Sequence, residues 1–169
     1  MNAVFRVCPQ RDVSLYPQYV RALTGLPKAH LHLHLEGGMR PSTLAELAER
    51  YGMTVPAVRG FGSFSVFAAM YVAACEVLRS PDDLRRLVDE TIDDAVEAGA
   101  IWVEPAIYVP HHRERIGPPE AVLEIVLDQL SASSADRGIG AGLMMSADRT
   151  VDPSVAVELA RMRDRKSVV

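Results

Sequence analysis

The chain has 169 residues, of which 49% are hydrophobic and 24% are charged, and its formal net charge is −4. This composition is that of an ordinary globular domain, and its acidic balance argues against a nucleic-acid or anionic-membrane partner. No apolar stretch approaches the length of a membrane span, residues 1–12 contain no apolar core of a signal peptide, and two cysteines are too few for a disulfide framework. We therefore expect a cytoplasmic location.

Strand-like and helix-like segments alternate along the chain. Residues 1–25 are expected to form an N-terminal arm with a short helix, and residues 26–169 to belong to a single domain. Strands are expected at 28–36, 101–109 and 139–147, with a fourth beginning at 167–169, and helices at 40–53, 63–79, 80–100, 117–138 and 152–165.

Several helix ends carry capping signals. Thr43 and Glu46 have the spacing of a capping box, and Ser80 precedes Pro81 in the arrangement of an N-cap followed by a first-turn proline. Gly138 stands where the helix over 117–138 should stop.

The order of these segments predicts an α/β fold with a parallel sheet. An open doubly wound sheet and a (β/α)8 barrel both fit, with extra helices in the long connection between strands one and two. No glycine-rich phosphate-binding turn follows the first strand, which disfavours a nucleotide-binding open sheet. In a barrel, polar residues at the carboxyl end of a strand indicate an active site.

The first strand alternates histidine with leucine and then reaches a carboxylate. His30, His32, His34 and Glu36 should share one face of an extended strand, and the three leucines between them should pack on the other. A row of imidazoles ending in a carboxylate indicates a metal or proton-transfer site. Since three such positions span roughly 13 Å, at most two histidines can bind one ion, and His32 and His34 at the strand end are favoured.

The segment "LPKAHLHLHLEGGMRPSTLAELAERYG", with weaker support from "SFSVFAAMY" and "WVEP", resembles the opening of the adenosine deaminase family, within the metal-dependent amidohydrolase superfamily. The resemblance implies the N-terminal half of a (β/α)8 barrel that binds one Zn²⁺ per full-length chain. The implied reaction is hydrolysis of the exocyclic amine of a purine-type small molecule, with release of ammonia.

The resemblance also implies roles for particular residues. His32 and His34 would be two of the zinc ligands, and Glu36 would meet the hydroxyl end of a nucleoside substrate. Phe64 and Phe67 would belong to an apolar cover over the pocket. Zinc would supply an activated water, and a carboxylic acid that protonates the ring nitrogen is expected beyond Val169.

Three positions depart from the family pattern. His30 stands where the family often has an acid, and Glu36 replaces an aspartate, which could favour a free base or a modified nucleoside. Pro105 follows Glu104 in the second strand, where it suggests a bulge or an edge strand.

The length is the largest departure, because a (β/α)8 barrel needs roughly 250 residues. The remaining ligands would lie beyond Val169, so we expect this chain alone to be inactive. The alternative is a catalytically inactive truncated paralogue or interaction module of the same fold. Adenosine, adenine, an aminodeoxyfutalosine-like nucleoside and a pterin all remain open as substrates, and the oligomeric state is open too.

Simpler structural interpretations apply to several residues. Phe64 and Phe67 fit a core better than a cover, and His111 and His112 are expected in a solvated loop. Glu104 could serve as a structural hydrogen-bond acceptor inside the barrel. The acids of "VDETIDDAVEAG" fit a solvated helix face.

Overall fold

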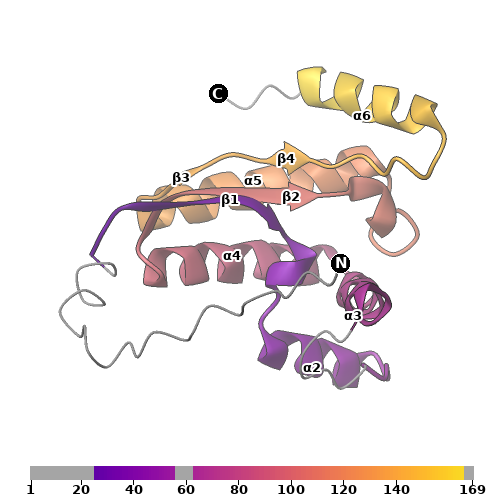
Figure 1. Cartoon of the computed structure of the whole chain (residues 1–169), viewed down its shortest axis with the longest axis horizontal. Coiled ribbons are helices and arrows are strands. Elements are labelled where there is room, and N and C mark those ends of the chain that lie inside the picture. The colour runs from indigo at the N-terminus through magenta and orange to yellow at the C-terminus, as the bar shows by residue number, and fades with distance from the viewer. Residues whose placement is uncertain (1–24, 56–62, 166–169) are drawn as a thin grey trace, which may run out of the picture.

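A computed structural model describes residues 25–55 and 63–165, and its centre is a parallel sheet (Figure 1). The order is β1–β2–β3, and β4 also pairs with β2. The strands are β1 (Lys28–His34), β2 (Ala100–Ile107), β3 (Gly140–Ala141) and β4 (Met144–Met145). The expected α/β class with a parallel sheet is confirmed.

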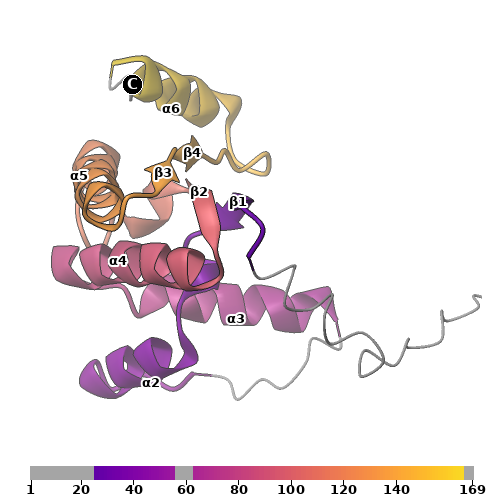
Figure 2. The same cartoon turned by 90° about the vertical axis from the view of Figure 1, so that its left-hand side faces the viewer.

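The helices follow the strands in the expected order. The connection from β1 to β2 holds three α-helices and a short 3-10 helix, α5 precedes β3, and α6 follows β4. When the molecule is turned, α4, α5 and α6 lie around the strands in chain order (Figure 2). The helices are η2 (Glu36–Gly38), α2 (Pro41–Arg50), α3 (Phe64–Glu76), α4 (Pro81–Glu97), η3 (Val109–His112), α5 (Pro119–Arg137) and α6 (Pro153–Arg165).

Two features expected from the sequence lie wholly or mostly outside the residues that the structure describes. The N-terminal arm lies, apart from Gly25, outside the described residues, and so does the fourth strand expected at 167–169. Within the described ranges, no helix is both long and apolar enough to cross a membrane.

The expected caps of α4 and α5 are present. Ser80 accepts a hydrogen bond from the backbone N–H of Asp83, and the Asp83 carboxylate accepts one from the backbone N–H of Ser80. Gly138 ends α5 in the left-handed conformation with φ 65°. These ends are set by local chemistry, so the sequence alone identifies them.

The capping box expected at Thr43 is wrong. Helix α2 has Arg40 as its N-cap and Pro41 in its first turn, so Thr43 already lies inside the helix. Its hydroxyl donates to Glu90 of α4 over 2.6 Å instead. Proline has no backbone N–H that would need an acceptor in the first turn, so α2 begins at Pro41 without a side-chain cap.

The core fills the space between the sheet and helices α4 and α5. Apolar residues three and four apart on each helix face the buried side chains of β2. The core residues of these three elements are Leu84, Leu87, Val88, Ile92 and Ala95 of α4, Val122, Leu123, Val126 and Leu130 of α5, and Ala100, Val103 and Ile107 of β2. This packing fixes β2, and β2 in turn holds β1 in place.

The acidic side of α4 is partly exposed and is also paired with arginines, so its interpretation as a solvated face holds only in part. Arg40 binds Asp94 at 2.6 Å, Arg86 binds Glu90 at 2.8 Å, and Arg137 of α5 also binds α4 carboxylates. Since α2 and α5 flank α4, its acids lie at two helix–helix boundaries. Partly exposed pairs of this kind each contribute about 0–1 kcal/mol, so they serve mainly to orient the helices.

Pro105 explains why the third expected strand is split into β3 and β4. The carbonyls of Val103 and Ile107 accept hydrogen bonds from the N–H groups of Gly142 and Ser146. In the alternating pattern of a parallel ladder, the N–H of residue 105 would donate to the carbonyl of Gly142, and proline has no N–H. The ladder therefore breaks at 142–143, although the register on the two sides of the break is the same.

Candidate functional site

The strand that carries the histidines ends at His34 and contains a bulge. His30 pairs with Val103 and Leu33 pairs with Pro105, so β1 places two residues opposite one. His32 lies in this bulge with φ 56°, a left-handed conformation that costs a non-glycine residue about 1–3 kcal/mol. Such strain concentrates at functional sites, and here it falls on a histidine predicted to bind metal.

The bulge overturns the strict alternation expected over residues 29–36. Leu31 is 62% exposed, whereas Leu35 is fully buried, so the three leucines do not form one packed face. Glu36 lies beyond the strand, in η2, rather than on the face expected from the sequence. An inserted residue reverses the face of everything after it, and the alternation of residue types gives no sign of the insertion.

The structure brings His32 and His34 together, as the sequence predicted for the metal pair. Their ring centres lie 5.2 Å apart with an interplanar angle of 55°, and both side chains are exposed. Two imidazoles at this separation fit a shared ion, because zinc binds each ring nitrogen at about 2.0–2.1 Å. Across residues 25–55 and 63–165, however, no group of three or more His, Cys, Asp or Glu side chains converges on one point.

Glu36 is buried and hydrogen-bonded through both of its oxygens. Its side chain accepts from the Tyr71 hydroxyl at 2.9 Å and lies 2.8 Å from Nε2 of His112. Burial alone would raise the pKa of Glu36, but the hydrogen bond and charge of His112, together with the Tyr71 hydroxyl, outweigh it and keep the pKa below its usual value. An ionised carboxylate only accepts hydrogen bonds, so His112 Nε2 is the donor.

His112 corrects the expectation of a solvated loop. It lies in η3, just after β2, and its side chain is fully buried, whereas the neighbouring His111 is exposed. Successive residues of a 3-10 helix point about 120° apart, so His112 can face inward while His111 faces solvent. Tyr71 was also missed, although a tyrosine in the apolar α3 needs a partner for its hydroxyl.

Comparison with known proteins now identifies the family. The family profile named adenosine deaminase matches residues 27–168. The chain belongs to the adenosine deaminase family. A Streptomyces virginiae protein named as an adenosine/adenine deaminase is 38% identical over 88% of this chain and 47% of its own length, and an adenine deaminase of Rhodopseudomonas palustris is 33% identical over 75% and 39%. The chain thus spans about half the length of the curated relatives it matches.

Solved structures agree with the family and define the fold. A zinc-bound amidohydrolase of Burkholderia ambifaria aligns with a TM-score of 0.80 and 27% identity, over 94% of this chain and 46% of that one. The adenine deaminase of Arthrobacter aurescens aligns with a TM-score of 0.71 and 25% identity, over 83% and 45%. This deaminase-family chain is therefore the N-terminal half of a (β/α)8 barrel, with its extra helices between the first two strands.

The two phenylalanines of α3 in this deaminase-family chain are not core residues, contrary to the simpler interpretation. Phe64 is 80% exposed and Phe67 is 44% exposed, and their rings lie 6.1 Å apart. Tyr71, further along the same helix, is the residue that reaches Glu36. The role of Phe64 and Phe67 as a cover over substrate stays a prediction.

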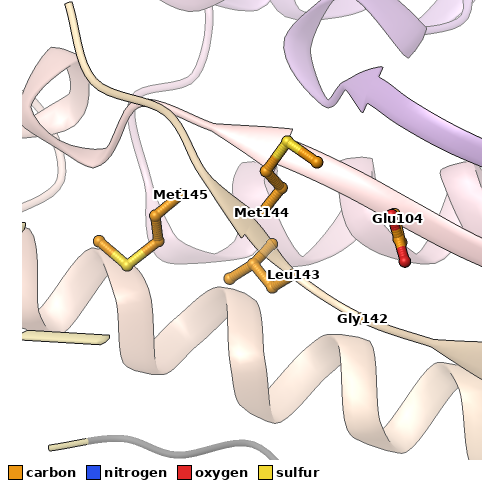
Figure 3. A pocket seen from close by; sticks show the side chains of 5 residues that line it. All are labelled: Glu104, Gly142, Leu143, Met144 and Met145. Carbon is orange, nitrogen blue, oxygen red and sulfur yellow. The ribbon is translucent and has the colours of Figure 1, made fainter. Parts of the chain in front are cut away.

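Glu104 accepts a hydrogen bond, as expected, and its donor is the indole N–H of Trp102 at 3.0 Å. It lines a cavity of about 350 Å³ at the break between β3 and β4, together with Gly142, Leu143, Met144 and Met145 (Figure 3). The break in the sheet at Pro105 thus lies beside this cavity. His32 and His34 of β1 are not among the residues that line this cavity.

Proposed function

We propose that the protein containing this chain is a zinc-dependent aminohydrolase that removes the exocyclic amino group of adenine, adenosine or a related aminopurine. The observation that carries the proposal is the pairing of His32 and His34 at the carboxyl end of β1, with strain on His32. The family and the zinc in the Burkholderia structure support it. A cytoplasmic location is part of the same proposal.

In this proposal each residue has a stated task. His32 and His34 hold one zinc ion, which supplies an activated water when it is bound. Glu36 lies two residues beyond His34 and is proposed to meet a hydroxyl of a nucleoside substrate. Each of its oxygens accepts one hydrogen bond, from Tyr71 or from His112, and keeps a further lone pair for that contact. Phe64 and Phe67 are proposed to exclude water above the purine.

The test supplies the missing half of the barrel. The chain is joined to the second half of the Streptomyces virginiae relative, and ammonia release from adenine and from adenosine is measured with and without zinc. We expect deamination by the joined protein, none by its His34→Ala variant, and none by the 169-residue chain alone.

Two results would contradict the proposal. A joined protein that folds and binds zinc but releases no ammonia from any aminopurine would favour the non-catalytic interaction module. Ammonia release by the chain alone, after chelation and readdition of zinc, would show that it needs no ligands from another segment.

A further inference from the structure

Three segments that are far apart in the sequence meet at one carboxylate. Glu36 lies in η2, Tyr71 in α3 and His112 in η3, and the two donors hold different oxygens of the carboxylate at 2.9 and 2.8 Å. Glu36 is 1% exposed and His112 is fully buried. The cluster therefore fastens the end of β1 to the segment after β2 and to α3.

The cluster is also in contact with the proposed metal pair. The ring of His34 stands edge-on to the ring of Tyr71, with 5.9 Å between centres and an angle of 84°. A Cβ placed on Gly37 would lie 3.7 Å from the Cβ of His34 and 4.0 Å from the Tyr71 ring. The backbone of η2 thus lies against both side chains, and a shift of Glu36 would move the surroundings of His34.

A buried carboxylate is held in place by its donors. Removing one donor leaves part of the charge without compensation in a dry site, and the usual response is that the carboxylate turns toward water. Glu36 lies in η2, whose backbone at Gly37 packs against His34 and Tyr71, so a turn of its carboxylate toward water would disturb that packing. The N–H of Leu35, just before Glu36, donates to the Ala106 carbonyl of β2 at 2.9 Å and holds this point of the backbone against the sheet. A displacement of Glu36 would therefore change the packing beside His34 rather than shift the whole segment.

We propose that His112 and Tyr71 are positioning residues, which fix the Glu36 carboxylate and through it the orientation of the His34 imidazole for the metal. The proposal rests on the metal role assigned above to His34. It adds two residues that touch neither the metal nor the aminopurine.

The first measurement needs no metal. In the purified chain, the edge-on rings should give a nuclear Overhauser contact between His34 and Tyr71, which would report the orientation of His34. We expect His112→Ala to abolish this contact and His112→Gln to restore it, because the glutamine amide can donate to Glu36. Ser133→Ala is the matched control, since Ser133 is 2% exposed and its hydroxyl donates to Asp89 at the far boundary of α4 and α5.

The second measurement is the affinity for Zn²⁺ alone, followed by titration calorimetry well below the melting temperature. We expect His112→Ala and Tyr71→Phe to weaken zinc binding on the order of 10-fold, and Ser133→Ala to leave it unchanged. Tyr71→Phe removes one hydroxyl and keeps the ring, so it serves if His112→Ala does not fold. His112→Gln should bind zinc nearly as well as the unaltered chain.

The outcomes separate this inference from the proposed function. If the unaltered chain binds zinc no better than His34→Ala, the proposed metal site fails, and the ring contact still decides the positioning role. If His112→Ala keeps both the ring contact and the zinc affinity, the positioning role is wrong. Equal losses in His112→Ala and Ser133→Ala would also overturn it, because they would reflect only general stability.

Discussion

The hydroxyl of Tyr51 donates a hydrogen bond of 2.6 Å to the carboxylate of Asp83, which joins the end of α2 to the start of α4. The same carboxylate accepts from the backbone N–H of Ser80 and from Arg50 at 3.2 Å. Asp83 is 2% exposed, although it lies in the first turn of a helix. One buried carboxylate thus caps α4 and fixes the position of α2.

Replacing Asp83 by alanine should lower the free energy of unfolding by about 2–3 kcal/mol, since it removes a helix cap and leaves buried donors unpaired. The matched control is Asp82→Ala in the same helical turn, whose side chain is 91% exposed and pairs with Arg85 three residues on. Urea unfolding of the two variants checks the difference. Equal losses would show that the buried carboxylate of Asp83 contributes no more to stability than the exposed one of Asp82.

The contribution of Asp83 should depend on pH. Burial would raise its pKa, but hydrogen bonds from Tyr51 and from the backbone of Arg79 and Ser80 outweigh burial and keep the pKa below its ordinary value. Because the pKa of Asp83 is lower in the folded than in the unfolded chain, its ionised carboxylate stabilises the fold fully at pH values above the unfolded pKa of about 3.9. This stabilisation is lost as the pH falls through the folded-state pKa. The difference in unfolding free energy between the unaltered chain and Asp83→Asn should therefore be constant near neutral pH and shrink below about pH 4.

Gly140→Ala should destabilise the sheet by about 1–3 kcal/mol, because a Cβ there would overlap the ring of Trp102. At Gly142 the added Cβ would lie 3.3 Å from the same ring, so Gly142→Ala should cost less. The single tryptophan of the chain reports the shift by its fluorescence. In a Trp102→Ala background the cost of Gly140→Ala should disappear, and a cost that persists would locate the strain elsewhere.

The features that the sequence predicted correctly are those set by local chemistry. Ser80 and Gly138 mark helix ends because the capping groups are part of the local segment. His32 and His34 were identified as a pair because their spacing and position at the strand end point to the same site. The parallel sheet followed from the alternation of segments alone.

The features that the sequence missed depend on contacts between distant segments. The bulge at His32 belongs to the pairing of β1 with β2, and strand alternation contains no sign of it. His112 is buried because its ring bonds to the buried carboxylate of Glu36, which needs a hydrogen-bond donor. Glu36 lies 76 positions earlier in the chain, so the local sequence around His112 does not reveal this contact. Thr43 has the spacing of a cap but bonds to Glu90 of another helix.

Pro105→Ala should join β3 and β4 into one strand. The new N–H would donate to the carbonyl of Gly142, and the gain of about 0.5–1.5 kcal/mol is nearly offset by the greater freedom of the unfolded chain. Amide exchange measures the effect, because the amide of residue 105 should be strongly protected. Pro81→Ala is the control, since an amide in the first turn of α4 has no acceptor within the helix and should exchange rapidly.

The three histidines of β1 should differ in their effect on zinc. His32→Ala and His34→Ala should each abolish tight zinc binding by the joined barrel, because each removes one ligand of a minimal set. His30→Ala should leave the zinc content nearly intact, since His30 precedes the bulge and pairs with Val103, while the paired rings lie beyond it.

Metal analysis of the three purified variants decides between the possible ligand pairs. His30 is half-buried, so its loss should appear as a lower melting temperature and not as lost metal. Loss of zinc from His30→Ala, with zinc retained in His34→Ala, would move the ligand pair to His30 and His32. The His32 ring would then have to face His30 rather than His34, and the present separation of 5.2 Å between the His32 and His34 rings would have to increase.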